Sequence, residues 1–157
     1  MLESLTLKTK NGFWALKLTG SHVEGTILAF HGFARDTHFY ARLVDAMADR
    51  FRLILVDLPF HGETCWNAEY FTPEDLLELF EKISEVEDLR MPVYLMGHSL
   101  AGRLLLAVLP DLPFPIERMI ALTSDGLAAN RGSFFSDRIP FRLRLRYKTA
   151  ILDGRFV

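Results

Sequence analysis

The sequence lacks the features that mark membrane-spanning, secreted and disulfide-bonded proteins. Its single cysteine, Cys65, has no partner for an internal disulfide. No apolar run approaches the roughly 18 residues that a membrane span needs, and even residues 104–109 are followed at once by Pro110 and Asp111. Residues 1–12 are polar and hold no basic segment followed by an apolar run. A cytoplasmic location is therefore the default expectation.

An excess of charge of one sign is also missing. Lys and Arg number 18 against 20 Asp and Glu, which leaves a net charge of -2. This balance creates no long-range field that would attract nucleic acid, so a small-molecule partner is the better expectation. His31, His38 and His61 are not at helical i, i+4 spacing, and no CxxC or HExxH motif accompanies them. We expect neither a metal nor a cofactor.

What the sequence does contain is a series of short, continuous apolar runs. Half of its 157 residues are apolar, which is enough for one domain with a continuous core. The runs cover residues 27–30, 53–56, 93–96 and 119–122. Because they are continuous instead of alternating, they suit strands that are covered on both faces, as in a parallel sheet.

Helix signals lie between these runs. Thr37 is predicted to cap a first helix, because the apolar positions after it recur at i, i+3, i+4 and i+7. Those positions are Tyr40, Leu43, Val44 and Met47. Thr72 at the cap, Pro73 at the first helical position and Asp75 three after the cap predict a second helix start. The apolar face of that helix is predicted to be Leu76, Phe80, Ile83 and Val86. A third helix is expected from residue 100 to 109.

Ahead of the first apolar run, two segments are typical of an antiparallel hairpin. Residues 4–8 and 13–19 are separated by Asn11-Gly12, a turn signal. The hairpin would add to the edge of a sheet built from alternating strands and helices with right-handed crossovers. The predicted architecture is an α/β fold, a three-layer sandwich with a mostly parallel sheet.

The last part of the chain has a different composition. Residues 131–157 contain seven Lys or Arg and only two Asp, and residues 141–147 alternate apolar and basic side chains. We therefore divide the chain into residues 1–127, the sheet core, and residues 128–157, the start of a cap region or a tail. The alternation is compatible with a basic strand, an amphipathic surface segment or part of a cap. A solvated face with leucines and aromatics packed beneath it is the simplest interpretation.

The motif Gly97-His98-Ser99-Leu100-Ala101-Gly102 directly follows the third parallel strand and opens the next helix. In this context a G-x-S-x-G-type turn raises a serine above the sheet, and the residues two before and two after it must be small. Ala101 stands where glycine is more usual. A purely structural alternative is that Ser99 caps the helix.

A second loop lies at the same carboxyl edge of the sheet, where open α/β sheets place their sites. His31-Gly32-Phe33 ends the first parallel strand. The backbone N–H groups of Phe33 and Leu100 could converge on the oxyanion that forms when a carbonyl is attacked, each donor contributing about 3 kcal/mol. For His31, bracing of the loop by hydrogen bonds is the alternative to a part in the reaction.

Together with a third loop, these motifs resemble the α/β-hydrolase superfamily. The order is HGF, then DLPFHGET at residues 57–64, then GHSLAG, each at a strand end, and the likeness covers about residues 22–130. It is nearest to bacterial hydrolases with a D-L-x-x-H-G-x-S motif followed by tryptophan, here Trp66. The resemblance implies a Ser99 nucleophile, Phe33 and Leu100 as oxyanion donors, and residues 57–64 as a structural brace. Phe60 stands where that loop more often has glycine.

The candidate catalytic residues are therefore Ser99, Phe33 and Leu100, and the candidate substrate-binding residues are His31, Trp66 and His98. The superfamily orders its triad as serine, acid, histidine, but all five histidines here lie at or before residue 98. We expect that the chain lacks the triad base and represents the N-terminal portion of such an enzyme. Asp125 is either the triad acid or a turn residue.

Two functional hypotheses follow from these residues. The first is a serine hydrolase of esters or related carbonyl compounds, acting through a Ser99 acyl-enzyme and present here as a truncated chain. The second is a non-catalytic α/β module that acts through protein association. An unpaired edge strand at residues 119–122 would favour a homodimer or aggregation.

Overall fold

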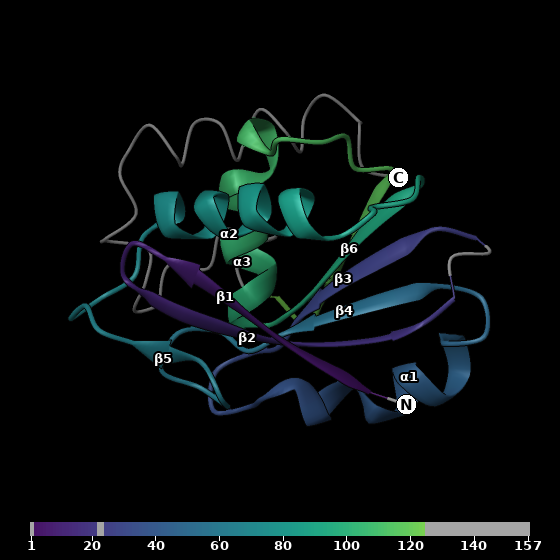
Figure 1. The fold of residues 1–157 in the computed structure, drawn as a ribbon, viewed down its shortest axis with the longest axis horizontal. Helices are drawn as coiled ribbons and strands as arrows, with labels where there is room; N and C mark the ends of the chain where they lie inside the picture. The colour runs from purple at the N-terminus through teal and green to yellow at the C-terminus, as the bar shows by residue number, and fades with distance from the viewer. Residues whose placement is uncertain (1, 22–23, 125–157) are drawn as a thin grey trace.

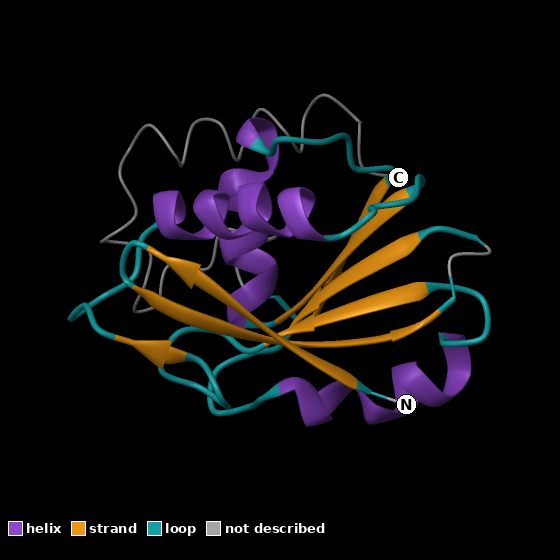
Figure 2. Ribbon diagram, viewed as in Figure 1, coloured by secondary structure: helices purple, strands orange, loops and turns teal. Residues whose placement is uncertain are grey.

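The computed structural model describes residues 2–21 and 24–124. Within these residues a mixed sheet lies between helices on its two faces (Figures 1 and 2). The strands are β1 Glu3–Thr9, β2 Gly12–Gly20, β3 Thr26–Phe30, β4 Arg52–Val56, β5 Cys65–Trp66, β6 Val93–His98 and β7 Arg118–Leu122. The helices are η1 Thr37–Tyr40, α1 Ala41–Met47, α2 Pro73–Val86, α3 Leu100–Val108 and η2 Leu109–Asp111. The predictions on Asp125 and on residues 128–157 lie outside the described part.

The strand order confirms the predicted sheet. It runs β1-β2-β4-β3-β6-β7, with β5 paired to β2. The four strands from the continuous apolar runs pair in parallel, and β1 and β2 form the antiparallel hairpin at one edge. The sheet separates two cores: one lies against α2 and α3, and the other against α1. This is the three-layer α/β sandwich expected from the sequence.

The hairpin turn is one residue earlier than predicted. Thr9 pairs with Gly12, so Lys10 and Asn11 form the turn and Gly12 is the first residue of β2. A Cβ at Gly12 would collide with the carbonyl oxygen of Cys65 on β5. This glycine is thus required by the close approach of β5, which only the tertiary structure shows.

The predicted cap of the first helix is wrong by one residue. The chain enters η1 through Asp36, whose side chain accepts the His38 N–H at 2.9 Å. The Thr37 N–H is already bound to Asp57 Oδ1 at 2.7 Å, which fixes Thr37 inside the first turn. The long-range bond to Asp57 therefore decides the start of this helix.

The second helix begins as predicted. Thr72 and Asp75 form a complete capping box, and Pro73 occupies the first turn of α2. Leu76, Leu79, Phe80 and Ile83 are buried against the sheet. Val86, predicted to share this face, is instead exposed at the last position of α2. The third helix, α3, ends at Val108 and passes into η2, close to the predicted end.

Among the described residues, β7 is the edge strand opposite the β1–β2 hairpin. Successive side chains of β7 alternate between exposed and partly buried positions. Ile120 and Leu122 are among the exposed ones, at 44% and 37%. Met119, on the opposite face, packs against the core that contains α2 and α3. In the described part of the chain, no helix has the length and apolar character needed to cross a membrane.

Candidate active site

Ser99 lies at the sharp turn between β6 and α3. Its backbone angles, φ 49° and ψ -112°, are in a region that residues other than glycine rarely adopt. The Ser99 N–H donates to the Leu122 carbonyl of β7 at 2.8 Å, which ties the turn to the neighbouring strand. The Ser99 side chain makes no capping bond to α3. The predicted strained strand-to-helix turn is confirmed, and helix capping does not explain this serine.

The small residues around Ser99 are required by packing. A Cβ at Gly97 would lie 2.7 Å from the Gly102 nitrogen and 2.9 Å from Leu105 Cδ1. A Cβ at Gly102 would collide with the Ser124 hydroxyl. Ala101 is completely buried, so its methyl group fills the space that this turn leaves. The turn therefore tolerates alanine at position 101 but needs glycine at positions 97 and 102.

The loop after β3 lies directly against this turn. A Cβ at Gly32 would be 2.6 Å from His98 Nδ1 and 3.2 Å from Ser99 Cβ. Phe33 follows Gly32, and Leu100 is the first residue of α3, where an N–H has no acceptor within the helix. The close approach at Gly32 thus brings the two expected oxyanion donors to the same end of the sheet.

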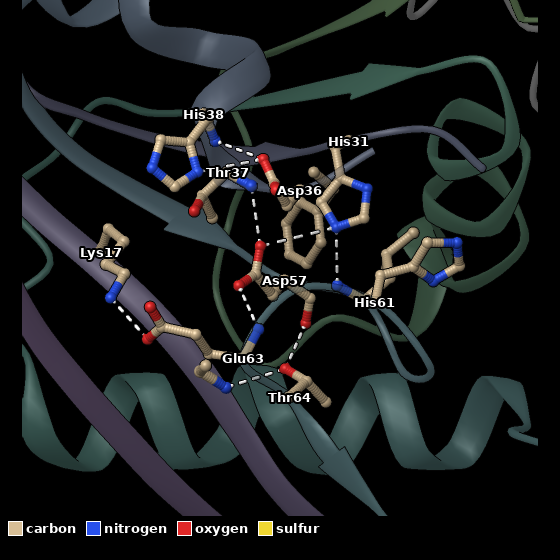
Figure 3. Close-up of polar contacts among 12 residues, drawn as sticks. Lys17, His31, Asp36, Thr37, His38, Asp57, His61, Glu63 and Thr64 are labelled. Atoms are coloured by element: carbon tan, nitrogen blue, oxygen red, sulfur yellow. Dashed lines mark hydrogen bonds and ion pairs between the residues drawn. The ribbon is translucent and has the colours of Figure 1, made fainter. Parts of the chain in front are cut away.

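His31 is completely buried and holds two loops together. The Leu58 N–H donates to its Nε2 at 3.0 Å (Figure 3). Its Nδ1 lies 2.8 Å from the Gly32 carbonyl oxygen. A carbonyl can only accept, so Nδ1 carries the proton and donates, while Nε2 offers its lone pair. Burial lowers the pKa of His31, which agrees with a neutral ring. This geometry supports the bracing role.

Asp57 is the centre of the loop that follows β4. Its buried carboxylate accepts the Thr37 N–H through Oδ1 and the Glu63 N–H through Oδ2 at 2.9 Å (Figure 3). The Thr64 hydroxyl donates to the Asp57 carbonyl at 2.7 Å and accepts the Ala15 N–H of β2. The Asp57 side chain thus connects η1 to its own loop, and its backbone carbonyl connects that loop through Thr64 to β2, in the manner expected of a structural brace.

The loops and the turn described above lie within a match to a known family. A family model described as the alpha/beta hydrolase fold matches residues 25–144. The chain belongs to the alpha/beta hydrolase fold family. The match includes the turn at Ser99, the loop at Gly32 and the brace at Asp57.

Curated relatives of this hydrolase-fold chain are longer than it is. It is 29% identical over 107 residues to the magnesium-chelatase 30 kDa subunit of Rhodobacter capsulatus, covering 65% of this chain and 36% of the relative. It is 26% identical over 127 residues to a Drosophila melanogaster protein named "Probable serine hydrolase", covering 79% of this chain and 38% of that one. The chain therefore spans well under half the length of these two relatives.

Solved structures agree on the fold. A candidate lipase from Acinetobacter baumannii has a TM-score of 0.71 and 22% identity, covering 98% of this chain and 61% of that chain. The carboxylesterase CesB from Bacillus subtilis has a TM-score of 0.68 and 20% identity, covering 79% and 44%. At these identities the likeness establishes the hydrolase fold alone.

Phe60, where the family's loop more often has glycine, shows why glycine is favoured there. Its φ is 67°, in the left-handed region, and the residue is 57% exposed. Gly62, two residues later, also has a positive φ, and a Cβ there would collide with the Asp57 carboxylate. The hydrolase-fold loop keeps its shape at a local conformational cost at Phe60.

Trp66 belongs to a different part of the sheet from Ser99. It lies in β5, and its ring packs edge-on against Trp14 at 5.5 Å and Phe71 at 6.2 Å. Its Nε1 donates to the Tyr70 carbonyl at 3.2 Å. Because β4 and β3 lie between β2 and β6, the structure does not bring Trp66 and Ser99 together.

The histidines that the structure describes make their contacts with residues other than Ser99. His31 and His61 accept backbone N–H groups through Nε2, and exposed His38 contacts Asp36 at 3.2 Å. The His98 ring stacks on Phe39 with centroids 4.5 Å apart, and its buried Nδ1 has no hydrogen-bond partner in the described part. Within residues 2–21 and 24–124, no group of three or more His, Cys, Asp or Glu is placed to hold a metal ion.

Proposed function

We propose that this chain carries the nucleophile and oxyanion site of a serine hydrolase acting on esters or related carbonyl compounds, with Ser99 as nucleophile. The observation that carries the proposal is the strained turn at Ser99, between a parallel strand and a helix that begins at Leu100. Strain of this kind persists only where the surrounding structure holds it, and it clusters at functional sites. The serine hydrolase among the relatives supports the same reaction class.

In the proposed mechanism, Ser99 Oγ attacks the carbonyl carbon while its proton passes to a base. The carbonyl oxygen becomes an oxyanion, for which the Phe33 and Leu100 N–H groups are the proposed donors. The tetrahedral intermediate then expels the alcohol, which takes the proton from the base, and leaves an acyl-Ser99 ester. Water repeats the sequence and releases the carboxylic acid.

The base is proposed to lie outside the described residues. His31 and His61 each use both ring nitrogens with backbone groups, so neither has a lone pair free for the Ser99 proton. His98 precedes Ser99 in the turn, and its ring lies on Phe39. All five histidines of the sequence lie ahead of Ser99, whereas the family orders its triad as serine, acid, histidine. Because a serine hydroxyl is a weak nucleophile without a base, we expect the 157-residue chain by itself to show little or no ester turnover.

The test is covalent labelling of Ser99 by a fluorophosphonate, with and without added imidazole as an external base. We expect slow labelling that imidazole accelerates, with the mass increase located on Ser99 and absent in Ser99→Ala. Absence of imidazole-dependent labelling in a folded chain would reject Ser99 as a nucleophile. Fast ester hydrolysis without imidazole, abolished in Ser99→Ala, would instead show that this chain already contains the base.

A second candidate function is a non-catalytic module that associates with protein, including a second copy of this chain. It is favoured by exposed Ile120 and Leu122 on β7, and by the relative that is named as a subunit of magnesium chelatase. Light scattering over a range of concentrations tests it. Self-association that weakens in Ile120→Lys but not in Val86→Lys, another exposed apolar site, would support it; a monodisperse monomer at all concentrations would reject self-association through β7.

A further inference from the structure

We propose that His61 is a positioning residue for the oxyanion loop, acting with His31 to hold the Phe33 amide from both sides. This inference rests on the proposed function, because it assigns a purpose to the loop that follows β3. The loop is defined as residues 31–34. His31 holds this loop at Gly32 and His61 holds it at Ala34, with Phe33 between these two contacts.

The contact of His61 is a direct hydrogen bond to the loop. The Ala34 N–H donates to His61 Nε2 at 3.1 Å. On the other side of the ring, Nδ1 lies 2.8 Å from the Pro59 carbonyl oxygen. Because the carbonyl can only accept and the amide can only donate, the ring is a neutral imidazole with its proton on Nδ1. The Pro59 carbonyl thus selects the His61 tautomer whose Nε2 can accept the Ala34 N–H.

His31 makes the matching contact one residue before Phe33. Its Nδ1 donates to the Gly32 carbonyl at 2.8 Å, and its Nε2 accepts the Leu58 N–H. The two imidazoles also contact each other edge-on, with centroids 5.3 Å apart, and their rings are neighbours in Figure 3. Both histidines are oriented by the loop after β4, so that loop controls the position of the loop after β3.

The conformation of Ala34 shows that this restraint is needed. Its φ is 55°, in the left-handed region that a non-glycine residue seldom occupies. Ala34 is exposed, so core packing does not impose this conformation. The hydrogen bond to His61 and the ring contact of Phe33 with His61, at 5.6 Å, are the interactions that hold it.

The functional consequence concerns the N–H of Phe33. An oxyanion donor contributes only when it is fixed where the charge develops. If the Ala34 N–H is released, the peptide between Phe33 and Ala34 can rotate, and the backbone of Phe33, which carries the proposed donor N–H, loses its restraint on that side.

The experiment measures hydrogen exchange at the Ala34 amide of the full 157-residue chain by NMR. In His61→Ala we expect about a tenfold loss of protection, the size of one hydrogen bond. In His61→Gln the side-chain oxygen replaces Nε2 as acceptor, so protection should be restored. The matched control is His38→Ala, an exposed histidine that does not contact this loop.

Each outcome decides the proposal. Unchanged Ala34 protection in His61→Ala would overturn it, and so would His61→Gln behaving like His61→Ala while the β3 and β4 amides stay protected. Imidazole-dependent labelling of Ser99 should fall in His61→Ala and recover in His61→Gln. If labelling persists unchanged while Ala34 protection is lost, the positioning role is wrong but Ser99 remains the nucleophile. If no variant labels yet Ala34 responds as expected, the contact stands and the proposed function fails.

Discussion

At the scale of single residues, the site contains several residues whose backbone conformation is unfavourable for any residue except glycine. Ala34, Phe60, Ser99 and Thr123 all have positive φ values without being glycine. The first three lie in the loops that end β3, β4 and β6, at the carboxyl edge of the parallel strands. Such residues lower stability and persist only where neighbouring contacts fix them. Their location supports the assignment of this edge as the functional one.

Replacement of Gly32 by alanine should separate the oxyanion loop from the turn at Ser99. Its Cβ would lie 2.6 Å from His98 Nδ1, so the loop must move away. We expect imidazole-dependent labelling of Ser99 to fall about 100-fold, the effect of losing one oxyanion donor. Thermal unfolding verifies that the variant is folded. Labelling at the wild-type rate in a folded Gly32→Ala chain would contradict the placement of this loop.

Replacement of Phe60 by glycine should stabilise the chain. Glycine adopts a φ of 67° without strain, and the lost ring is mostly exposed, so we expect a gain of about 1 kcal/mol in the free energy of unfolding. Urea denaturation measures it. Phe33→Gly is the matched control, because Phe33 is 75% exposed and is not among the positive-φ residues. Equal effects of both substitutions would show that strain at Phe60 is not the cause.

At the scale of elements, helix starts differ in how they are fixed. The capping box of α2 is entirely local, because Thr72 and Asp75 bind each other's backbone within one turn. The start of η1 combines a local cap by Asp36 with a hydrogen bond from the Thr37 N–H to Asp57, a residue far along the chain. Local capping is therefore predictable from sequence, whereas a helix start that is fixed by a distant residue is set by the fold.

Loss of the Thr72 hydroxyl should destabilise α2. Thr72→Ala removes the acceptor for the Asp75 N–H, and the expected loss is about 1 kcal/mol in the free energy of unfolding. Thr72→Ser keeps the hydroxyl and should cost much less. Denaturant unfolding of both variants checks the prediction. A Thr72→Ser chain that is as unstable as Thr72→Ala would point to loss of the methyl group instead.

At the scale of the whole molecule, buried His31 couples the fold to pH. Its pKa is lowered by burial below the ordinary value of 6.5, so the unfolded chain binds this proton more readily than the folded chain. Stability should therefore be full above pH 6.5 and fall as the pH drops from there toward the lower folded pKa. The maximum slope from one such group is about 1.4 kcal/mol per pH unit.

Urea unfolding between pH 7 and pH 5 measures this effect. His31→Gln should have a flatter profile than the wild type, because the titrating group is gone. His38→Gln, at an exposed site, should keep the wild-type slope. A wild-type free energy of unfolding that does not change over this range would contradict the prediction.

The sequence by itself determined the parallel strands, the hairpin, the α2 start and the strand-turn-helix context of Ser99. These features depend on hydrophobic runs, local capping and small residues at fixed spacing, all of which are visible in neighbouring positions. The tertiary structure alone decided that Gly12 belongs to β2, that Asp57 fixes the start of η1, and that Trp66 lies away from Ser99. It also brought His61 to Ala34, 27 residues apart. Such contacts arise where strand ends meet at one edge of the sheet, and no local pattern encodes which loops will touch there.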